Sequence, residues 1–303
     1  MNRLAVDFAG VELHNPVVLN SGCVGFGREY SELFDLNNIG GICVKGMTLK
    51  PRAGNPAPRC AETPSGMLNA VGLQNPGVDA FIQDELPWLR QFRTKVIANI
   101  SGNHEDEYAE LAWKLANAGV DMIEVNISCP NVKDGGIVFG TSPDAAKAVA
   151  LAVKNHALDA PVVIKLSPNV ADIGLMARAV VDGGADAISL INTVTGMVID
   201  TQTKRPVLRN NVGGLSGAAV LPVAVRCVWQ AANAVDKPIL GMGGVCDLDG
   251  ALQMLLAGAD AVGIGTALFA EPLAAVNLVN DLQAYCEAHD TTIAALTGSV
   301  HTW

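Results

Sequence analysis

Two lysines interrupt short apolar segments that should be buried. Lys45 lies in the segment GICVKGMT (41–48) and Lys165 in the segment PVVIKLS (161–167). Burying an ammonium group without a partner costs several kcal/mol, so a buried lysine implies a negative charge nearby. Because few carboxylates lie near these lysines in the sequence, we interpret them as partners of a bound anion.

The sharpest local motif is NISCPN (126–131), which leaves an apolar segment and contains Cys129. A thiol can act as a general base when its surroundings lower its pKa from about 8.5 toward the working pH. Most free cysteines are instead small hydrophobic core residues. Because Cys129 lies between two asparagines at the end of an apolar segment, we predict a chemical role for it. We assign the core role to the other six cysteines, which are Cys23, Cys43, Cys60, Cys227, Cys246 and Cys286.

Glycines end two further apolar segments, as GMGG (241–244) and GIGT (263–266). Either group alone is compatible with a simple tight turn. Together they are typical of a phosphate site, in which backbone N–H groups and a helix N-terminus face the anion. A dinucleotide-binding motif is the weaker interpretation, because its glycines should follow the first strand of a βαβ unit.

These groups follow short apolar segments that are rich in Val and Ile. Most of the segments lack strict alternation, as expected for strands that are covered on both faces. There are eight, at 17–23, 41–48, 96–101, 122–129, 161–167, 187–193, 238–244 and 261–267. Polar or glycine residues at the end of every segment suggest that the ends converge on one site.

Helical patterns separate these segments. They lie at 105–118, 142–156, 172–181, 218–234, 247–257 and 272–289. Strand and helix alternating eight times predicts an α/β fold of the TIM (β/α)8 barrel type, with a doubly wound open sheet as the alternative. A short N-terminal β-hairpin is expected at 4–6 and 11–13. Long connections at 49–75 and 194–217, and a loop after the fourth strand, should lie at the ligand-binding end. No linker is evident, so residues 1–303 are expected to form one domain.

Composition excludes several other functions. The net charge of −10 and the absence of a Lys/Arg cluster argue against binding to nucleic acid. No segment is long and apolar enough for a signal peptide or a membrane span. The seven cysteines form no CxxC pair and the five histidines show no metal-ligand spacing, so we expect free thiols in the cytoplasm and no metal site.

Five motifs taken together resemble the class 1 dihydroorotate dehydrogenases over essentially the whole chain, and the NAD-linked class 1B catalytic subunit most of all. The motifs are NAVGLQNPG (69–77), NISCPN (126–131), INT (191–193), GGLSG (213–217) and GMGG (241–244). The resemblance implies a TIM barrel that binds FMN and oxidises dihydroorotate to orotate in pyrimidine biosynthesis.

The resemblance also implies the site residues. FMN contacts are expected from Ser21, Lys45, Gly46, Asn99, Asn126, Lys165, Ile191, Gly217, Gly243, Gly244, Gly265 and Thr266. Substrate contacts are expected from Lys45, Asn69, Ala70, Val71, Gly72, Leu73, Asn126, Asn131, Asn192 and Thr193. Asparagine offers both a donor and an acceptor, which suits a ring that carries amide and imide groups.

The expected mechanism has three parts. Cys129 removes a proton from C5 of dihydroorotate, a hydride leaves C6 for N5 of the flavin, and Lys165 stabilises the negative charge that develops. Class 1B membership implies a partner subunit with FAD and a [2Fe–2S] cluster, in a heterotetramer built around a catalytic homodimer. Three alternatives remain open. They are a fumarate-linked class 1A enzyme, another FMN barrel acting on a dihydropyrimidine, and a non-catalytic flavin-binding barrel.

Overall fold

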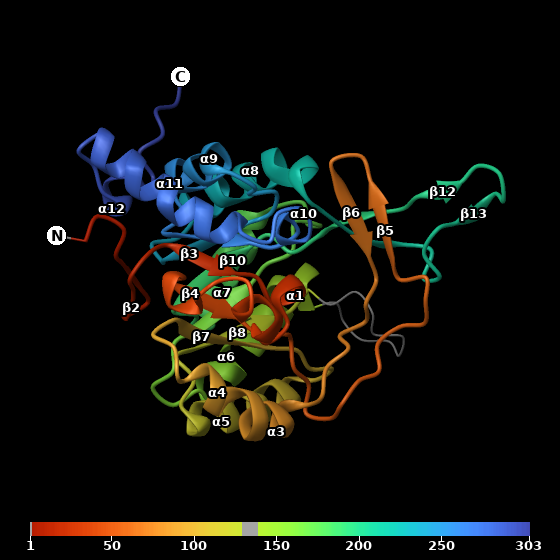
Figure 1. Cartoon of the computed structure of the whole chain (residues 1–303). Coiled ribbons are helices and arrows are strands. Elements are labelled where there is room, and N and C mark those ends of the chain that lie inside the picture. The colour runs from red at the N-terminus through yellow and green to blue at the C-terminus, as the bar shows by residue number, and fades with distance from the viewer. Residues whose placement is uncertain (1, 129–138) are drawn as a thin grey trace.

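The computed structural model describes residues 2–128 and 139–303. Its centre is a closed barrel of eight parallel strands in the order β10–β15–β16–β3–β4–β7–β8–β9 (Figure 1). The strands are β3 (Val17–Leu19), β4 (Gly41–Cys43), β7 (Lys95–Ile100), β8 (Met122–Asn126), β9 (Val162–Lys165), β10 (Ala187–Leu190), β15 (Ile239–Met242) and β16 (Ala261–Ile264). Each predicted apolar segment contains one of them, or all but its first residue, so the TIM-barrel prediction is confirmed and the open sheet is wrong.

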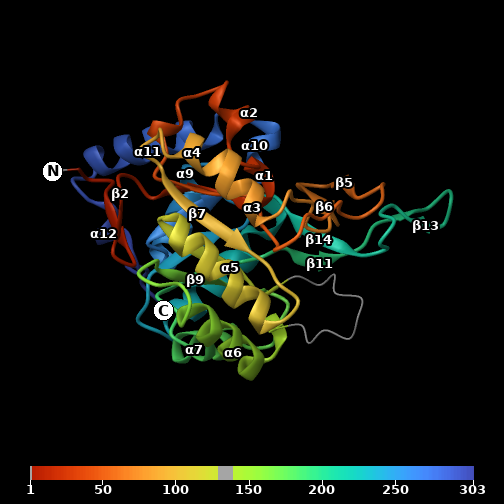
Figure 2. The same ribbon diagram turned by 90° about the horizontal axis from the view of Figure 1, so that it is seen from below.

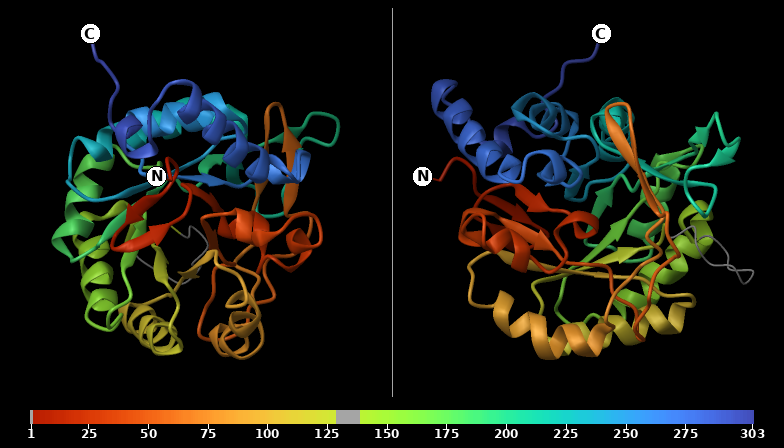
Figure 3. Two further views of the ribbon diagram at one scale, coloured as in Figure 1. Left: turned by 60° about the vertical axis from the view of Figure 1, so that its left-hand side comes forward. Right: turned by 45° about the vertical axis from the view of Figure 1, so that its right-hand side comes forward.

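Helices surround the barrel, as the left panel of Figure 3 shows. The main ones are α5 (Glu105–Ala118), α6 (Pro143–Lys154), α7 (Ile173–Asp182), α8 (Leu221–Ala232), α9 (Leu248–Ala257) and α11 (Ala274–Ala288). Side chains cap several N-termini, and the carboxylate of Asp172, for example, accepts from the N–H of Leu175 at 2.9 Å. Helix α5 ends at Gly119, whose φ of +79° suits a left-handed C-cap.

Shorter helices fill the connections between the main elements. They are α1 (Ser21–Val24), α2 (Arg28–Ser31), η1 (Leu36–Asn38), α3 (Val78–Ala80), the π-helical η2 (Phe81–Glu85), α4 (Leu86–Leu89), η3 (Phe139–Thr141), η4 (Ala218–Val220), α10 (Ala267–Ala270) and α12 (Ile293–Leu296). The predicted helix at 218–234 is thus divided into η4 and α8. None of the described helices is long and apolar enough to cross a membrane.

A hairpin closes the amino end of the barrel. Its strands are β1 (Val6–Phe8) and β2 (Val11–Leu13), which pair antiparallel, and the hairpin lies across the barrel end in Figure 3. The hairpin prediction is confirmed, although the first strand begins at Val6 rather than at residue 4. Phe8 and Leu13 are buried in the main core, so the amino end is sealed by apolar side chains.

A second sheet stands at the carboxyl end. It has four strands in the order β11–β14–β6–β5, and we call it the mouth sheet. The strands are β11 (Val194–Gly196), β14 (Gly213–Ser216), β6 (Gly66–Asn69) and β5 (Cys60–Thr63). They come from the two long connections that follow barrel strands β4 and β10, and Figure 2 shows them together beside the barrel. The small pair β12 (Ile199–Asp200) and β13 (Arg205–Pro206) extends beyond them.

Candidate active site

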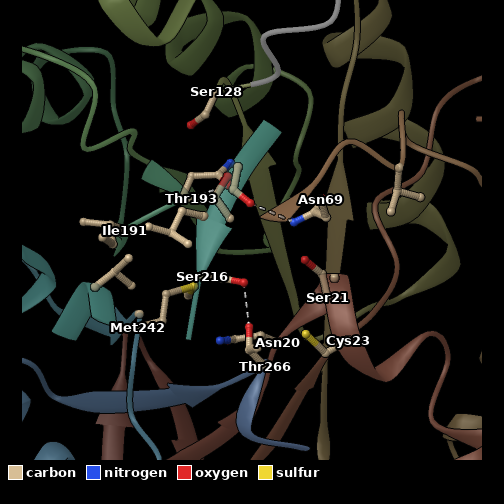
Figure 4. Close-up of a pocket in the computed structure, with 18 of the residues that line it drawn as sticks. Asn20, Ser21, Cys23, Asn69, Ser128, Ile191, Thr193, Ser216, Met242 and Thr266 are labelled. Atoms are coloured by element: carbon tan, nitrogen blue, oxygen red, sulfur yellow. Dashed lines mark hydrogen bonds between the residues drawn. The ribbon is translucent and has the colours of Figure 1, made fainter. Parts of the chain in front are cut away.

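A cavity of ≈ 630 Å³ opens at the carboxyl end of the barrel, between the strand ends and the mouth sheet. Volumes of roughly 300–1,000 Å³ are usual for cofactor and ligand sites. Figure 4 shows Ser21 and Cys23 on one side of this space, with Ile191 and Met242 on the other. The structure brings every described residue of the predicted site to this cavity. They are Ser21, Lys45, Gly46, Asn69, Ala70, Val71, Gly72, Leu73, Asn99, Asn126, Lys165, Ile191, Asn192, Thr193, Gly217, Gly243, Gly244, Gly265 and Thr266.

Two predicted residues, Cys129 and Asn131, lie outside the described part of the chain. The last described residue before them, Ser128, lines the cavity. Its hydroxyl donates to the backbone oxygen of Lys165 at 3.1 Å, and its N–H donates to the Asn126 side chain at 3.1 Å. The described part of the motif therefore contributes Asn126 and Ser128 to the cavity wall.

A layer of polar side chains crosses the barrel below the cavity. We call it the polar layer, and it consists of Cys43, Asn99, Glu124, Lys165 and Ser189, from five neighbouring strands. Glu124 is fully buried, and one of its carboxylate oxygens lies 3.6 Å from Nζ of Lys165. The sequence offered few nearby carboxylates and favoured a bound anion as the partner of Lys165, but the structure supplies a carboxylate partner within the protein. Glu124 is distant from Lys165 in the sequence, but strands β8 and β9 are paired, which brings the two side chains together.

Hydrogen bonds hold the Glu124 carboxylate in place. The Ser189 hydroxyl donates to Oε1 at 2.6 Å, the Cys43 thiol donates to Oε2 at 3.0 Å, and the Asn99 amide also donates to Oε2. Burial by itself would raise the pKa of the Glu124 carboxyl. The charge of Lys165 and the three donors outweigh burial and bring this pKa below its ordinary value, so the group is ionised.

Amide side chains form one wall of the cavity. The Asn192 amide donates to the Asn126 side chain at 3.2 Å, and the Asn69 amide donates to the Gly214 oxygen of the mouth sheet at 3.5 Å. Asn169, which was not among the predicted site residues, donates to the Thr193 oxygen at 3.0 Å and also lines the cavity. Its position in SPN (167–169), just after the fifth barrel segment, was the available signal.

Glycines and small polar groups form the opposite wall. Gly243 and Gly244 adopt φ values of +118° and +84°, and a Cβ on Gly244 would lie 2.6 Å from the Leu221 nitrogen. Only glycine fits this backbone without strain. The Thr266 hydroxyl donates to the Ser216 hydroxyl at 2.8 Å (Figure 4). Among the described residues Asn20 Oδ1 has no hydrogen-bond partner, although it is buried and its side chain lines the cavity.

The cysteine predictions need correction. Cys43, Cys227 and Cys286 are buried as expected, but Cys60 and Cys246 are exposed, and both line the cavity. Cys23 lines it as well, and burial raises the pKa of its thiol to about 11 although Lys165, Thr266 and Lys45 act in the opposite direction. Cys23 is therefore a neutral thiol near pH 7. Within the described ranges no group of three or more His, Cys, Asp or Glu residues could hold a metal ion.

A family model and individual relatives of known name all indicate one protein family for this chain. A family model described as dihydroorotate dehydrogenase matches residues 3–285. The chain is 51% identical over 299 residues to a protein of Geobacter sp. (strain M21), covering 98% of both chains. It is 54% identical over 285 residues to one of Geotalea uraniireducens (strain Rf4), covering 94% of this chain and 93% of the other. Both relatives are named dihydroorotate dehydrogenase B (NAD(+)), catalytic subunit.

A solved structure supports the fold. The crystal structure of DHODH in complex with ferulenol from Eimeria tenella superimposes with a TM-score of 0.80, covering 98% of this chain and 89% of that one. At 19% identity this likeness concerns the fold alone.

Proposed function

The chain belongs to the dihydroorotate dehydrogenase family, and from this premise we propose that it oxidises dihydroorotate to orotate as the FMN-bearing catalytic subunit of an NAD⁺-linked enzyme. The observation that carries this proposal is the cavity itself. It combines an amide wall, a glycine wall and a buried lysine at the carboxyl end of the barrel, where such enzymes bind their ligands.

The residues present fit FMN. Asn20 Oδ1 is a buried acceptor without a partner among the described residues, and a bound group with hydroxyl or N–H donors would satisfy it. The tight backbone at Gly243 and Gly244 allows a phosphate to approach main-chain groups closely. We assign FMN contacts to Ser21, Lys45, Gly46, Asn99, Asn126, Lys165, Ile191, Gly217, Gly243, Gly244, Gly265 and Thr266.

The amide wall fits the dihydroorotate ring, whose amide and imide groups need donors and acceptors together. We assign substrate contacts to Lys45, Asn69, Ala70, Val71, Gly72, Leu73, Asn126, Asn192 and Thr193, and on sequence grounds to Asn131. Because Asn126 Oδ1 already accepts from Asn192 and from the Ser128 N–H, its amide group remains directed to donate. Asn126 thereby orients a ring carbonyl.

The proposed chemistry separates a proton from a hydride. We assign removal of the C5 proton to Cys129 on the NISCPN motif. Bound FMN supplies the acceptor for the hydride that leaves C6. Lys165 provides a positive charge that is already in position where negative charge arrives, and such preorganised charge is worth more in a cavity that excludes water than in solution.

The relatives' names indicate a separate electron-transfer subunit. We propose that this partner holds FAD and a [2Fe–2S] cluster, since a cluster of this kind needs four ligands and the described part of this chain offers no such group of cysteines. We further propose a heterotetramer around a catalytic homodimer in the cytoplasm, with residues 1–303 as one domain.

The visible spectrum of the purified chain under anaerobic conditions tests this function. We expect a yellow protein whose flavin band bleaches when dihydroorotate is added. With the partner subunit present, NAD⁺ should restore the band, whereas recovery with fumarate would indicate a fumarate-linked enzyme. A yellow protein that only another dihydropyrimidine bleaches would change the substrate, and a colourless protein that takes up no FMN would refute the proposal.

The Cys129→Ala variant tests the assignment of the base. We expect flavin reduction by dihydroorotate to slow by on the order of 10²-fold or more, as is typical when a general base is lost. Cys227→Ala, which removes a thiol on the buried face of helix α8, is the matched control, and its flavin should be reduced at the wild-type rate. Unchanged reduction in Cys129→Ala would remove this thiol from the mechanism.

A further inference from the structure

Glu124 is a fully buried ionised group that the proposed chemistry does not use. Its carboxylate is held from three sides by Cys43, Asn99 and Ser189, and its fourth neighbour is the Lys165 ammonium at 3.6 Å. Within the described residues Lys165 is its single ion-pair partner. A buried carboxylate needs compensation of this kind, so the polar layer is built around Glu124.

The two members of the pair are not equivalent. Glu124 has no exposed surface, whereas the Lys165 side chain is 10% exposed and lines the cavity. No described residue accepts a hydrogen bond from Nζ of Lys165, because the contact with Glu124 is an ion pair longer than a hydrogen bond. The negative charge of Glu124 thus holds the Lys165 ammonium at the cavity wall. The N–H groups of the ammonium remain directed to a ligand in the cavity.

We propose that Glu124 is a positioning residue for Lys165, and that its negative charge sets how readily the cavity accepts additional negative charge. The carboxylate holds the ammonium at the cavity wall and partly cancels its field. Since electrons arrive at FMN next to Lys165, Glu124 controls the reduction potential of the bound cofactor. This inference rests on the proposed function.

The direction of the effect follows from the charges. Removing the negative charge of Glu124 leaves the positive field of Lys165 uncompensated in a poorly screened site. Reduction adds negative charge, so it becomes more favourable and the potential of the flavin rises. At an effective dielectric constant of about 20, a charge several ångströms away should change the equilibrium constant for reduction by about tenfold or more.

The experiment compares Glu124→Gln with wild type by titrating the bound flavin against redox dyes of known potential. Glutamine keeps the shape and one of the two acceptor oxygens but removes the charge. We expect the midpoint potential to rise, by the shift that corresponds to about a tenfold larger equilibrium constant. Ser189→Ala is the matched control, because it deletes a hydrogen bond to the same carboxylate and leaves the charge, and it should shift the potential much less.

A second pair of variants covers the case in which Glu124→Gln does not fold. Lys165→Gln leaves the buried Glu124 without its counter-charge, which raises the pKa of this carboxyl. Lys165→Gln is therefore compared with Glu124→Gln/Lys165→Gln at an alkaline pH at which infrared absorption shows Glu124 ionised, so that the two variants differ by the charge of Glu124. The double variant buries no uncompensated charge. Its flavin should have a higher potential than that of Lys165→Gln. Equal potentials in either comparison, with only thermal stability changed, would overturn the inference and leave Glu124 a structural residue.

These outcomes are distinct from failure of the proposed function. If the chain holds no flavin, or holds one that dihydroorotate does not bleach, the function is wrong. If dihydroorotate bleaches the flavin normally and removing the Glu124 charge leaves its potential unchanged, the function stands and the role of Glu124 is wrong.

Discussion

The polar layer and the mouth sheet face the same cavity but are built in different ways. The polar layer belongs to barrel strands, its members are all buried, and the charged group at its centre has a partner for each carboxylate oxygen. The mouth sheet comes from two long connections, and among the described residues the buried members of its own hydrophobic cluster are Leu68, Ala70 and Leu208. One side of the cavity is therefore rigid and the other is weakly supported.

This difference suggests a division of labour. Charge that must be preorganised lies in the barrel, where movement would require breaking a large core. The groups that we propose to contact a ligand as it enters include Asn69 on the mouth sheet, where it bonds to Gly214 across two strands from separate connections. Changes in the polar layer should alter rates, and changes in the mouth sheet should alter binding.

The largest effect is expected in the polar layer. Lys165→Ala should slow flavin reduction at saturating dihydroorotate by about 10²–10³-fold, the cost of losing a preorganised charge at the reacting centre. Stopped-flow absorbance measures this rate, and Lys147→Ala on the outer surface is the control. If the flavin of Lys165→Ala is reduced at the normal rate, the polar layer does not control the reaction rate, and its contrast with the mouth sheet loses its main support.

A change in the small core of the mouth sheet should act on binding. Leu68→Ala leaves a cavity in a cluster of three buried residues, and burial losses of this kind cost about 2–5 kcal/mol. We expect KM for dihydroorotate to rise by about tenfold, with faster hydrogen exchange at residues 60–69 and unchanged exchange in the barrel strands. A loss of barrel protection equal to that of the mouth sheet would show that the two regions are one cooperative unit.

A smaller effect is expected from a single amide. Asn69→Ala removes a proposed substrate hydrogen bond, worth about 1 kcal/mol, so KM should rise by about fivefold while kcat changes little. Steady-state kinetics measures both constants. A fall in kcat with constant KM would place Asn69 among the groups that act on the reaction itself, contrary to the proposed division.

The smallest effect concerns stability in acid. The pKa of Glu124 is below the ordinary glutamate value of 4.5 in the folded state, because the charge of Lys165 and three hydrogen-bond donors outweigh burial. Its ionisation therefore stabilises the fold above pH 4.5, and this contribution is lost as the pH falls through the lowered pKa. Glu124→Gln should therefore show a shallower loss of thermal stability below about pH 4.5 than wild type. Differential scanning calorimetry across this range measures the slope, and equal slopes would mean that other carboxyl groups dominate it.

The sequence was sufficient for the barrel because strands buried on both faces produce apolar segments that stand out one by one. It was also sufficient for the residues at the strand ends, which come together in any parallel barrel. The mouth sheet was not predicted, because β6 and β14 are short, rich in glycine and polar residues, and paired between connections far apart in the chain. Glu124 was missed for a related reason. In MIEVN (122–126) it resembles an ordinary strand residue, and only the pairing of β8 with β9 brings it to Lys165.

The same pairing has a consequence for how the barrel assembles. Side chains alternate along a strand, so a slip of one residue between β8 and β9 would turn Lys165 to the outside of the barrel and leave Glu124 inside without a counter-charge. An uncompensated buried carboxylate costs several kcal/mol, which is comparable with the stability of a whole domain. The ion pair therefore favours the observed register of β8 and β9 over a register shifted by one residue.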